Sequence, residues 1–284
     1  MAAGSVVYRR WLRDRLRSTI AWAAGIVIVV VASAAFYPSF SDASGDALSG
    51  GGDAMSTLLG LSNGIDPTSP LGFLWVSLYA NILPWMLMAL GAALGTASIA
   101  IDEDSGTLEF LLARPVTRSA VALARFGGMV TVLLAVSVVS ALALIISLPL
   151  FDLSQAVATT DSSGSPVTEP AATAGDVVAG TFAAFAVGLS IGGVAYLLGA
   201  TTGNKNVALG GASAIGIGGY VLYTLSNMTS NLEALTWVSP WRWYIDDAML
   251  INGLDWDVAL PFVTALVCLV VGWMVFVRRD IRGA

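Results

Sequence analysis

The sequence predicts an all-α polytopic membrane protein with six transmembrane helices. Hydrophobic residues make up 56% of the 284 residues and charged residues only 11%, whereas about a quarter of a typical soluble domain is charged. The mean hydropathy of +0.80 indicates the same class. A helix needs about 20 apolar residues to cross a hydrocarbon core. Six segments satisfy this length, near residues 18–37, 71–100, 119–149, 176–201, 206–226 and 258–277.

The distribution of charge predicts that both termini are cytoplasmic. Basic residues near spans are retained on the cytoplasmic side of a membrane. An N-terminus inside the cell places twelve of the 13 basic residues on that side and leaves only Arg242 outside. Most of the 19 acidic residues then face outward. This acidic exterior indicates a salt-loving (halophilic) source, because salt screens repulsion between like charges; a surface that concentrates cationic substrates is the alternative.

We expect one membrane domain over residues 1–284, in the plasma membrane. A short helix over residues 1–17 is expected to lie on the inner membrane surface, because apolar residues form one stripe of it and arginines surround that stripe. The residues of the stripe are Val7, Trp11, Leu12 and Leu16. Extracytoplasmic loops are expected over residues 38–70, 150–175 and 227–257.

Two residue types exclude several kinds of chemistry. Histidine, the commonest general base and metal ligand, is absent. The single cysteine, Cys268, lies in an apolar run and cannot form an intrachain disulfide. No acidic or basic residue lies in the middle of a predicted span, which disfavours an ion-coupled transporter. Sodium sites built from carbonyl and hydroxyl oxygens remain open, and we expect no bound metal.

A charged island over residues 102–118 separates the second and third predicted spans. Its acidic residues come first and its arginines last, as a helix dipole favours. Ser105 or Asp104 can cap the helix, and Pro115 can end it near Arg114. Its apolar stripe consists of Leu108, Leu111 and Leu112. The island is therefore either a polar handle for a partner or a helix that rests on lipid headgroups.

The motif within this island is specific. It consists of Glu103, Gly106, Thr107, Leu108, Glu109, Leu111, Leu112, Ala113, Pro115, Val116 and Arg118, followed by Val121 and Arg125. It resembles the cytoplasmic loop of type 2 ABC exporter permeases, in which an acidic residue precedes Gly-Thr-Leu, paired leucines and Pro-Val-x-Arg. That family usually has a lysine where this chain has Arg125. A basic N-terminal helix, Tyr37-Pro38-Ser39 and Ser239-Pro240-Trp241 are similar to the antibiotic and multidrug exporter subgroup.

This resemblance implies a six-span subunit that pairs with a second permease copy, in a homodimer, and with two separate ABC ATPase subunits. ATP and Mg²⁺ would be held by the ATPases, since this chain has no phosphate loop, and the chain would not be an enzyme by itself. The cargo would be a hydrophobic or amphipathic small molecule; the other partner is membrane lipid, and no nucleic acid is expected. The resemblance assigns ATPase coupling to Glu103, Gly106, Thr107, Leu108, Glu109, Leu111, Leu112, Arg114, Pro115 and Arg118.

Small and aromatic residues predict two further features. Glycines four apart let helices approach closely in lipid, and Gly91 with Gly95, Gly188 with Gly192, and Gly199 with Gly203 have this spacing. In the fifth span, Gly211 and Gly218 are expected to pack against a neighbouring helix or at a dimer interface. Tryptophans before the sixth span predict an aromatic anchor at headgroup depth, or a substrate lid. They are Trp237, Trp241, Trp243 and Trp256.

Three functional classes remain open at the level of sequence. The first is an ABC exporter permease, with a permease for lipid, polysaccharide or metal-related cargo as the alternative within that superfamily. The second is a membrane-embedded enzyme, for which a Ser-Lys or Ser-Asn arrangement is not excluded. The third is a channel or structural scaffold, which predicts no ATPase partner.

Overall fold

The computed structural model describes residues 2–47, 69–108, 116–160, 166–169, 171–226, 233–246 and 248–279. It confirms a helical membrane fold, with 6 helical segments long and apolar enough to span a bilayer. The first five predicted spans correspond to α1 (Ala2–Ala47), α3 (Pro70–Leu74) with η1 (Trp75–Tyr79) and α4 (Ile82–Thr96), α7 (Arg118–Ser147), α8 (Ala174–Thr202) and α9 (Lys205–Ser226). The sixth consists of η3 (Trp256–Val258) and α13 (Ala259–Arg278).

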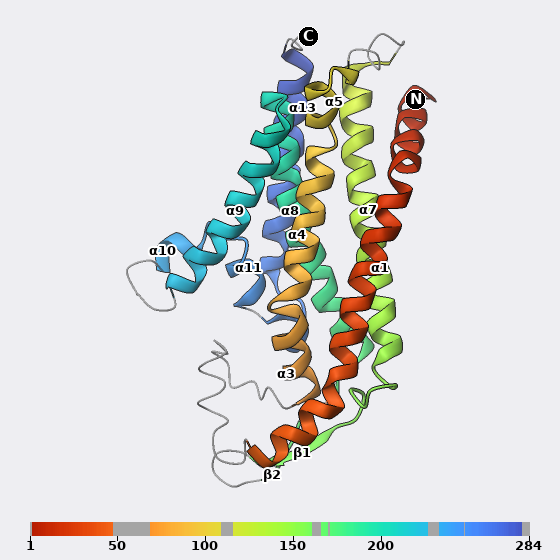
Figure 1. The fold of residues 1–284 in the computed structure, drawn as a ribbon. Helices are drawn as coiled ribbons and strands as arrows, with labels where there is room; N and C mark the ends of the chain where they lie inside the picture. The colour runs from red at the N-terminus through yellow and green to blue at the C-terminus, as the bar shows by residue number, and fades with distance from the viewer. Residues whose placement is uncertain are drawn as a thin grey trace.

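The spans form one elongated bundle with two different ends (Figure 1). Both termini and the short helix α5 (Ala100–Asp104) lie at one end, which we call the α5 end. At the other end lies an antiparallel hairpin of β1 (Val157–Thr160) and β2 (Pro166–Glu169), in which Val157 pairs with Glu169. This hairpin lies inside the loop predicted over residues 150–175. We call this the hairpin end.

Helix α8 is the centre of the bundle and packs directly on α4. A side chain at Gly91 would collide with the carbonyl of Gly188, and one at Gly95 would collide with the carbonyl of Gly192. The predicted glycine pairs therefore face each other across one helix interface, where the two backbones touch. In the fifth span, Gly211 packs against Leu198 of α8.

Gly218 differs from Gly211 in its surroundings. No described atom lies within 4 Å of where a Gly218 side chain would begin. The residue is exposed on α9. Its predicted packing within the chain is thus not found among the described residues.

The N-terminal segment is not a separate helix. Residues 2–17 are the first turns of α1, which continues without a break to Ala47. The predicted boundary near residue 18 is wrong because this segment has a protein partner: the Trp11 ring lies over Gly128 of α7 and is 5% exposed. The Tyr8 hydroxyl is also 2.8 Å from that of Thr131. The interfacial position of residues 1–17 stays a prediction.

The far end of α1 also extends beyond the predicted span. Pro38 lies inside the helix, where it removes one backbone hydrogen bond. The rings of Tyr37 and Phe40 both lie 5.2 Å from that of Phe73, centroid to centroid. This aromatic contact holds the segment helical, so the connection predicted over residues 38–70 begins later than expected.

The second span is interrupted at Ala80 and Asn81. A π-helical turn, η1, precedes the interruption, and α4 begins at Ile82. Pro84 lies in the first turn of α4. The backbone N–H groups of a first turn have no acceptor within the helix, so a proline, which has no N–H, is tolerated there. The break therefore falls just before the proline, near the predicted kink.

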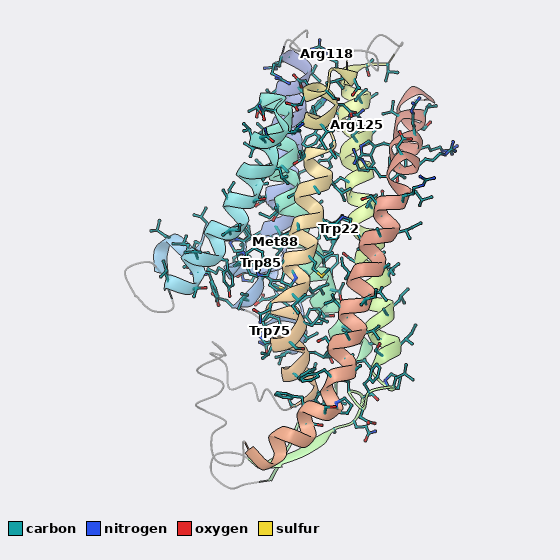
Figure 2. The ribbon with its side chains drawn as sticks, in the orientation of Figure 1. Trp22, Trp75, Trp85, Met88, Arg118 and Arg125 are labelled. Carbon is teal, nitrogen blue, oxygen red and sulfur yellow. The ribbon has the colours of Figure 1, made fainter. Side chains whose placement is uncertain are left out.

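The connection before the sixth span folds back against the bundle. It contains α10 (Glu233–Thr236), α11 (Arg242–Ile245) and α12 (Met249–Asn252). Trp241 is 0% exposed, and its indole N–H donates to the carbonyl of Gly216 in α9 at 2.9 Å. Its ring lies 4.6 Å from Trp85 and 4.9 Å from Tyr220. Trp85 projects from α4 (Figure 2).

The tryptophans of this connection therefore have different environments. Trp241 is enclosed by protein, whereas Trp237 and Trp256 are 50% and 62% exposed. The Tyr244 hydroxyl donates to the carbonyl of Tyr79 at 2.7 Å. Burial, with a smaller contribution from Tyr79, raises the pKa of Tyr244 well above its usual range. The prediction of an aromatic anchor at headgroup depth therefore stays open for Trp237 and Trp256, and it does not apply to the buried Trp241.

Candidate coupling site

Helix α5 is a single turn closed at its end by local hydrogen bonds. Gly106 follows it with φ +70°, a left-handed conformation that favours glycine. The hydroxyls of Ser105 and Thr107 donate back to the carbonyl of Asp102 at 3.3 and 3.1 Å. A new helical turn begins at Thr107. Helix α5 therefore ends at this turn, and Gly106 separates it from the turn that begins at Thr107.

Three consecutive acidic side chains of α5 each form an ion pair with a different spanning helix. The pairs are Asp102 with Arg125 of α7 at 2.5 Å, Glu103 with Arg279 after α13 at 2.5 Å, and Asp104 with Lys205 of α9 at 3.0 Å. Neighbouring positions on an α-helix point about 100° apart. A single turn can thus contact three helices, and we call Asp102, Glu103 and Asp104 the acidic triplet.

The pair between Asp102 and Arg125 is inside the bundle. Arg125 is 6% exposed and its other terminal nitrogen donates to the carbonyl of Ser98 at 2.8 Å. Arg125 projects from α7 toward this region (Figure 2). Because a buried guanidinium without a counter-charge is strongly unfavourable, Asp102 is what permits Arg125 to be buried here.

Glu103 is the most enclosed member of the acidic triplet, with a side chain that is 4% exposed. It lies against Gly203, which ends α8 with φ +65°. A side chain at Gly203 would collide with the Glu103 carboxylate. One turn earlier, Gly199 leaves room for Ala100 of α5, 3.1 Å from where a Gly199 side chain would begin. The predicted pair of Gly199 and Gly203 thus forms the seat of α5.

The third pair is different because water reaches it. The side chain of Lys205 is 54% exposed and that of Asp104 is 29% exposed. Exposed pairs of this kind contribute between zero and about 1 kcal/mol. The stability of the site therefore depends mainly on Asp102 and Glu103.

Two further arginines hold this region through backbone carbonyls. Arg15 of α1 donates to the carbonyl of Ala97 at 2.9 Å, just before α5. Arg118 of α7 donates to the carbonyl of Arg279 at 2.6 Å. Arg279, which follows α13, is thus held by α5 through its side chain and by α7 through its backbone carbonyl. The first, third, fifth and sixth spans contact this region through polar side chains, α8 packs against it, and the second span leads directly into it.

The comparison with known families agrees with this architecture. A family model described as ABC-2 family transporter protein matches residues 6–281. The chain belongs to the ABC-2 transporter family. No curated protein matches the sequence significantly. This ABC-2 chain is therefore a multi-pass membrane subunit of an ABC transporter. The permeases of this family are generally not catalytic themselves. Membership of the family implies an ABC ATPase as a partner.

The structure describes half of the residues to which the sequence assigned ATPase coupling in this ABC-2 subunit. Glu103, Gly106 and Thr107 lie at or beside α5, and Arg118 lies at the start of α7. Leu108 is 0% exposed, so it belongs to the core and is not an exposed handle as expected. The remaining residues, Glu109, Leu111, Leu112, Arg114 and Pro115, lie outside the described residues.

Sequence reasoning missed the basic partners of the acidic triplet in the ABC-2 subunit. Arg125 was noted only as a substitute for a family lysine, and Lys205 and Arg279 only as cytoplasmic charges. The sequence contained one signal for these partners. Arg125, Lys205 and Arg279 each lie at or near the end of a span that is close to α5. Three adjacent acids in a loop, together with basic residues at three helix ends, favour this arrangement but do not say which acid pairs with which base.

Proposed function

We propose that this chain is the transmembrane subunit of an ATP-driven exporter in which residues 102–118 receive force from separate ATPase subunits. The observation that supports this is the acidic triplet. Because α5 is bound by charge to α7, α9 and α13, a displacement of α5 is delivered to three spans at once. A loop that merely connected two spans would need no such bonds.

The proposal places the α5 end of the bundle in the cytoplasm, together with both termini. Two ABC ATPase subunits would bind ATP and Mg²⁺ and contact the segment after α5 of each permease. A second copy of this chain would complete the translocation pathway. The excess of basic residues at the α5 end supports this orientation, since such residues are retained inside.

The cargo that best suits this pathway is a hydrophobic or amphipathic compound. Apart from residues 9–17 of α1 and Arg125 of α7, the described spans carry acidic and basic side chains only at their ends. A pathway without charge offers no counter-ion to a strongly ionic substrate. Lipid, polysaccharide and metal-related cargo are the alternatives within the family, and transport assays with labelled compounds of each class separate them.

A test of coupling uses the complex co-purified from its own membranes. We expect a companion chain with a phosphate loop, and ATP-dependent uptake of a hydrophobic dye into inverted vesicles. Glu109→Ala and Leu112→Ala are expected to reduce uptake strongly while ATP hydrolysis continues, because the force is no longer transmitted. Leu235→Ala, which changes an exposed leucine of α10 far from α5, is the matched control. Normal coupling in both variants would show that the contact lies elsewhere.

A test of orientation uses single cysteines in a Cys268→Ala background. Ser105 is exposed beside α5, and Leu235 is exposed in α10, which follows the end of α9 opposite Lys205. A membrane-impermeant maleimide added to intact cells should label Leu235→Cys and spare Ser105→Cys. The opposite pattern would place α5 outside and end the proposal.

A further inference from the structure

The C-terminal end of α13 carries a hollow that the proposed mechanism does not use. It has a volume of about 390 Å³ and is lined by Val271, Met274, Val275, Arg278 and Arg279. These positions follow the spacing i, i+3, i+4, i+7 and i+8, so they form one face of the helix. The hollow is apolar along its length and cationic at the α5 end.

The charges around this hollow are unbalanced. Arg278 is exposed and has no ion-pair partner among the described residues. Arg279 gives one nitrogen to Glu103, while its Nε is buried without a hydrogen-bond partner in the described part of the chain. Arg118 reaches the same place through its bond to the Arg279 carbonyl. Of the three arginines, only Arg279 has a carboxylate partner among the described residues, which leaves N–H donors for an anion.

We propose that this hollow binds an anionic phospholipid, with the phosphate at Arg278 and Arg279 and an acyl chain along Val271 and Met274. Guanidinium groups suit a phosphate because several N–H groups can donate to its oxygens together. The apolar part lies on α13, where Val271 and Met274 are 36% and 40% exposed to the surroundings of the bundle. A residue seven positions before Arg278 lies about 10 Å from it along the helix axis, so the first methylene groups of a chain reach Val271.

The charge pattern distinguishes this occupant from a zwitterionic lipid. Arginines near a membrane surface are attracted to anionic lipids, and basic pockets beside spanning helices bind anionic headgroups. Here the headgroup would contact Arg278 and Arg279, and the acyl chain would contact Val271 and Met274 on the same face of α13. Both parts of the lipid would therefore contribute to binding. The bound lipid also shares Arg279 with Glu103, and it would therefore lie next to the acidic triplet.

The test uses native mass spectrometry of the purified chain in detergent, titrated with dioleoylphosphatidylglycerol or dioleoylphosphatidylcholine. We expect one phosphatidylglycerol to bind more tightly than the rest, without a matching phosphatidylcholine site. Arg278→Gln should weaken this binding roughly tenfold, as expected for loss of a charge-assisted hydrogen bond. Val271→Trp should weaken it as well, because the ring fills the apolar part of the hollow.

Two variants serve as matched controls. Arg13→Gln removes an exposed arginine at the α5 end, and Val263→Trp places the same ring on an exposed part of α13 nearer the hairpin end. Both should leave the tightest phosphatidylglycerol site unchanged. Equal binding of the two lipids, equal effects of test and control variants, or displacement of the lipid by inorganic phosphate alone would overturn the proposal. These measurements need no ATPase, so their failure is distinct from failure of the proposed function.

Discussion

The α5 end of the bundle and the region around Trp241 are held together by contacts of different kinds. At the α5 end, the acidic triplet binds three helices through charge, with Glu103 and Arg125 nearly excluded from water. Towards the hairpin end, Trp241 is enclosed by Trp85 and Tyr220, with one hydrogen bond to a helix carbonyl. The ion pairs depend on charge and on hydrogen-bond geometry. The aromatic contact depends on buried area and on the geometry of the rings.

The difference suggests a division of labour along the bundle. The α5 end is suited to receive a displacement and pass it on, because each ion pair links α5 to one specific helix. The aromatic contacts are suited to keep α4, α9 and the segment before α13 together. Four substitutions test this comparison, in order of decreasing expected effect.

Trp241→Ala tests the aromatic contact and should have the largest effect. It removes a fully buried ring and leaves a cavity among Trp85 and Tyr220, which costs about 4 kcal/mol of unfolding free energy. The free energy can be measured by titration with sodium dodecyl sulfate while helix content is followed by circular dichroism. Trp237→Ala, which removes a ring that is 50% exposed, is the control and should cost about 1 kcal/mol or less. Similar losses in both variants would mean that Trp241 is not a packing centre.

Glu103→Ala tests the most enclosed ion pair and should cost about 3 kcal/mol, because Arg279 loses its counter-charge in a buried place. The double variant Glu103→Ala with Arg279→Ala should recover part of the loss, since no charge is then left unpaired. The same detergent titration applies. A double variant no more stable than the single one would show that the two side chains do not depend on each other.

Gly203→Ala tests the seat of α5 and should cost about 2 kcal/mol, through left-handed backbone strain and the collision with the Glu103 carboxylate. Gly106→Ala is a matched control, because Gly106 has φ +70° and no described atom within 4 Å of an added side chain. It should cost only the strain, roughly 1 kcal/mol. Equal losses would remove the proposed contact between Gly203 and Glu103.

Asp104→Asn tests the exposed pair and should have the smallest effect, less than 1 kcal/mol. Any difference from the wild-type chain should shrink as salt is added, because the Debye length falls from about 10 Å at about 0.1 M salt to about 3 Å at about 1 M, which weakens exposed ion pairs. Thermal unfolding in detergent at low and high ionic strength measures this. A large, salt-independent loss would mean that Asp104 is as enclosed as Glu103.

Much of the fold could be predicted from the sequence because span length and apolarity are local properties. The ends of α7, α8 and α9 fall within two residues of the predicted spans, and the glycines of α4 and α8 meet as their spacing indicates. The prediction for α1 was less accurate at both ends. Contacts of Trp11 with Gly128 and of Tyr37 with Phe73 keep the chain helical, and such contacts depend on residues far away in the sequence.

The role of residues 102–118 in ATPase coupling stays a prediction, and the ion pairs around Glu103 could not be predicted from the sequence. The motif around Glu103 located the segment, whereas the ion pairs depend on which helix ends become neighbours after folding. Leu108 illustrates the limit: its spacing suggested an exposed stripe, yet the turn at Gly106 directs it into the core. A helical period gives the face of a helix but not what covers that face.

The direct backbone contact between α4 and α8 restricts how the protein can change shape. Where Gly91 and Gly95 meet Gly188 and Gly192, the two backbones are in contact, with the Cβ atoms of Leu87 and Ala195 beside them. Sliding one helix along the other would bring a larger residue onto a carbonyl, so the two must travel as a single rigid body. Any opening of a route through the membrane is then left to the helices around this pair.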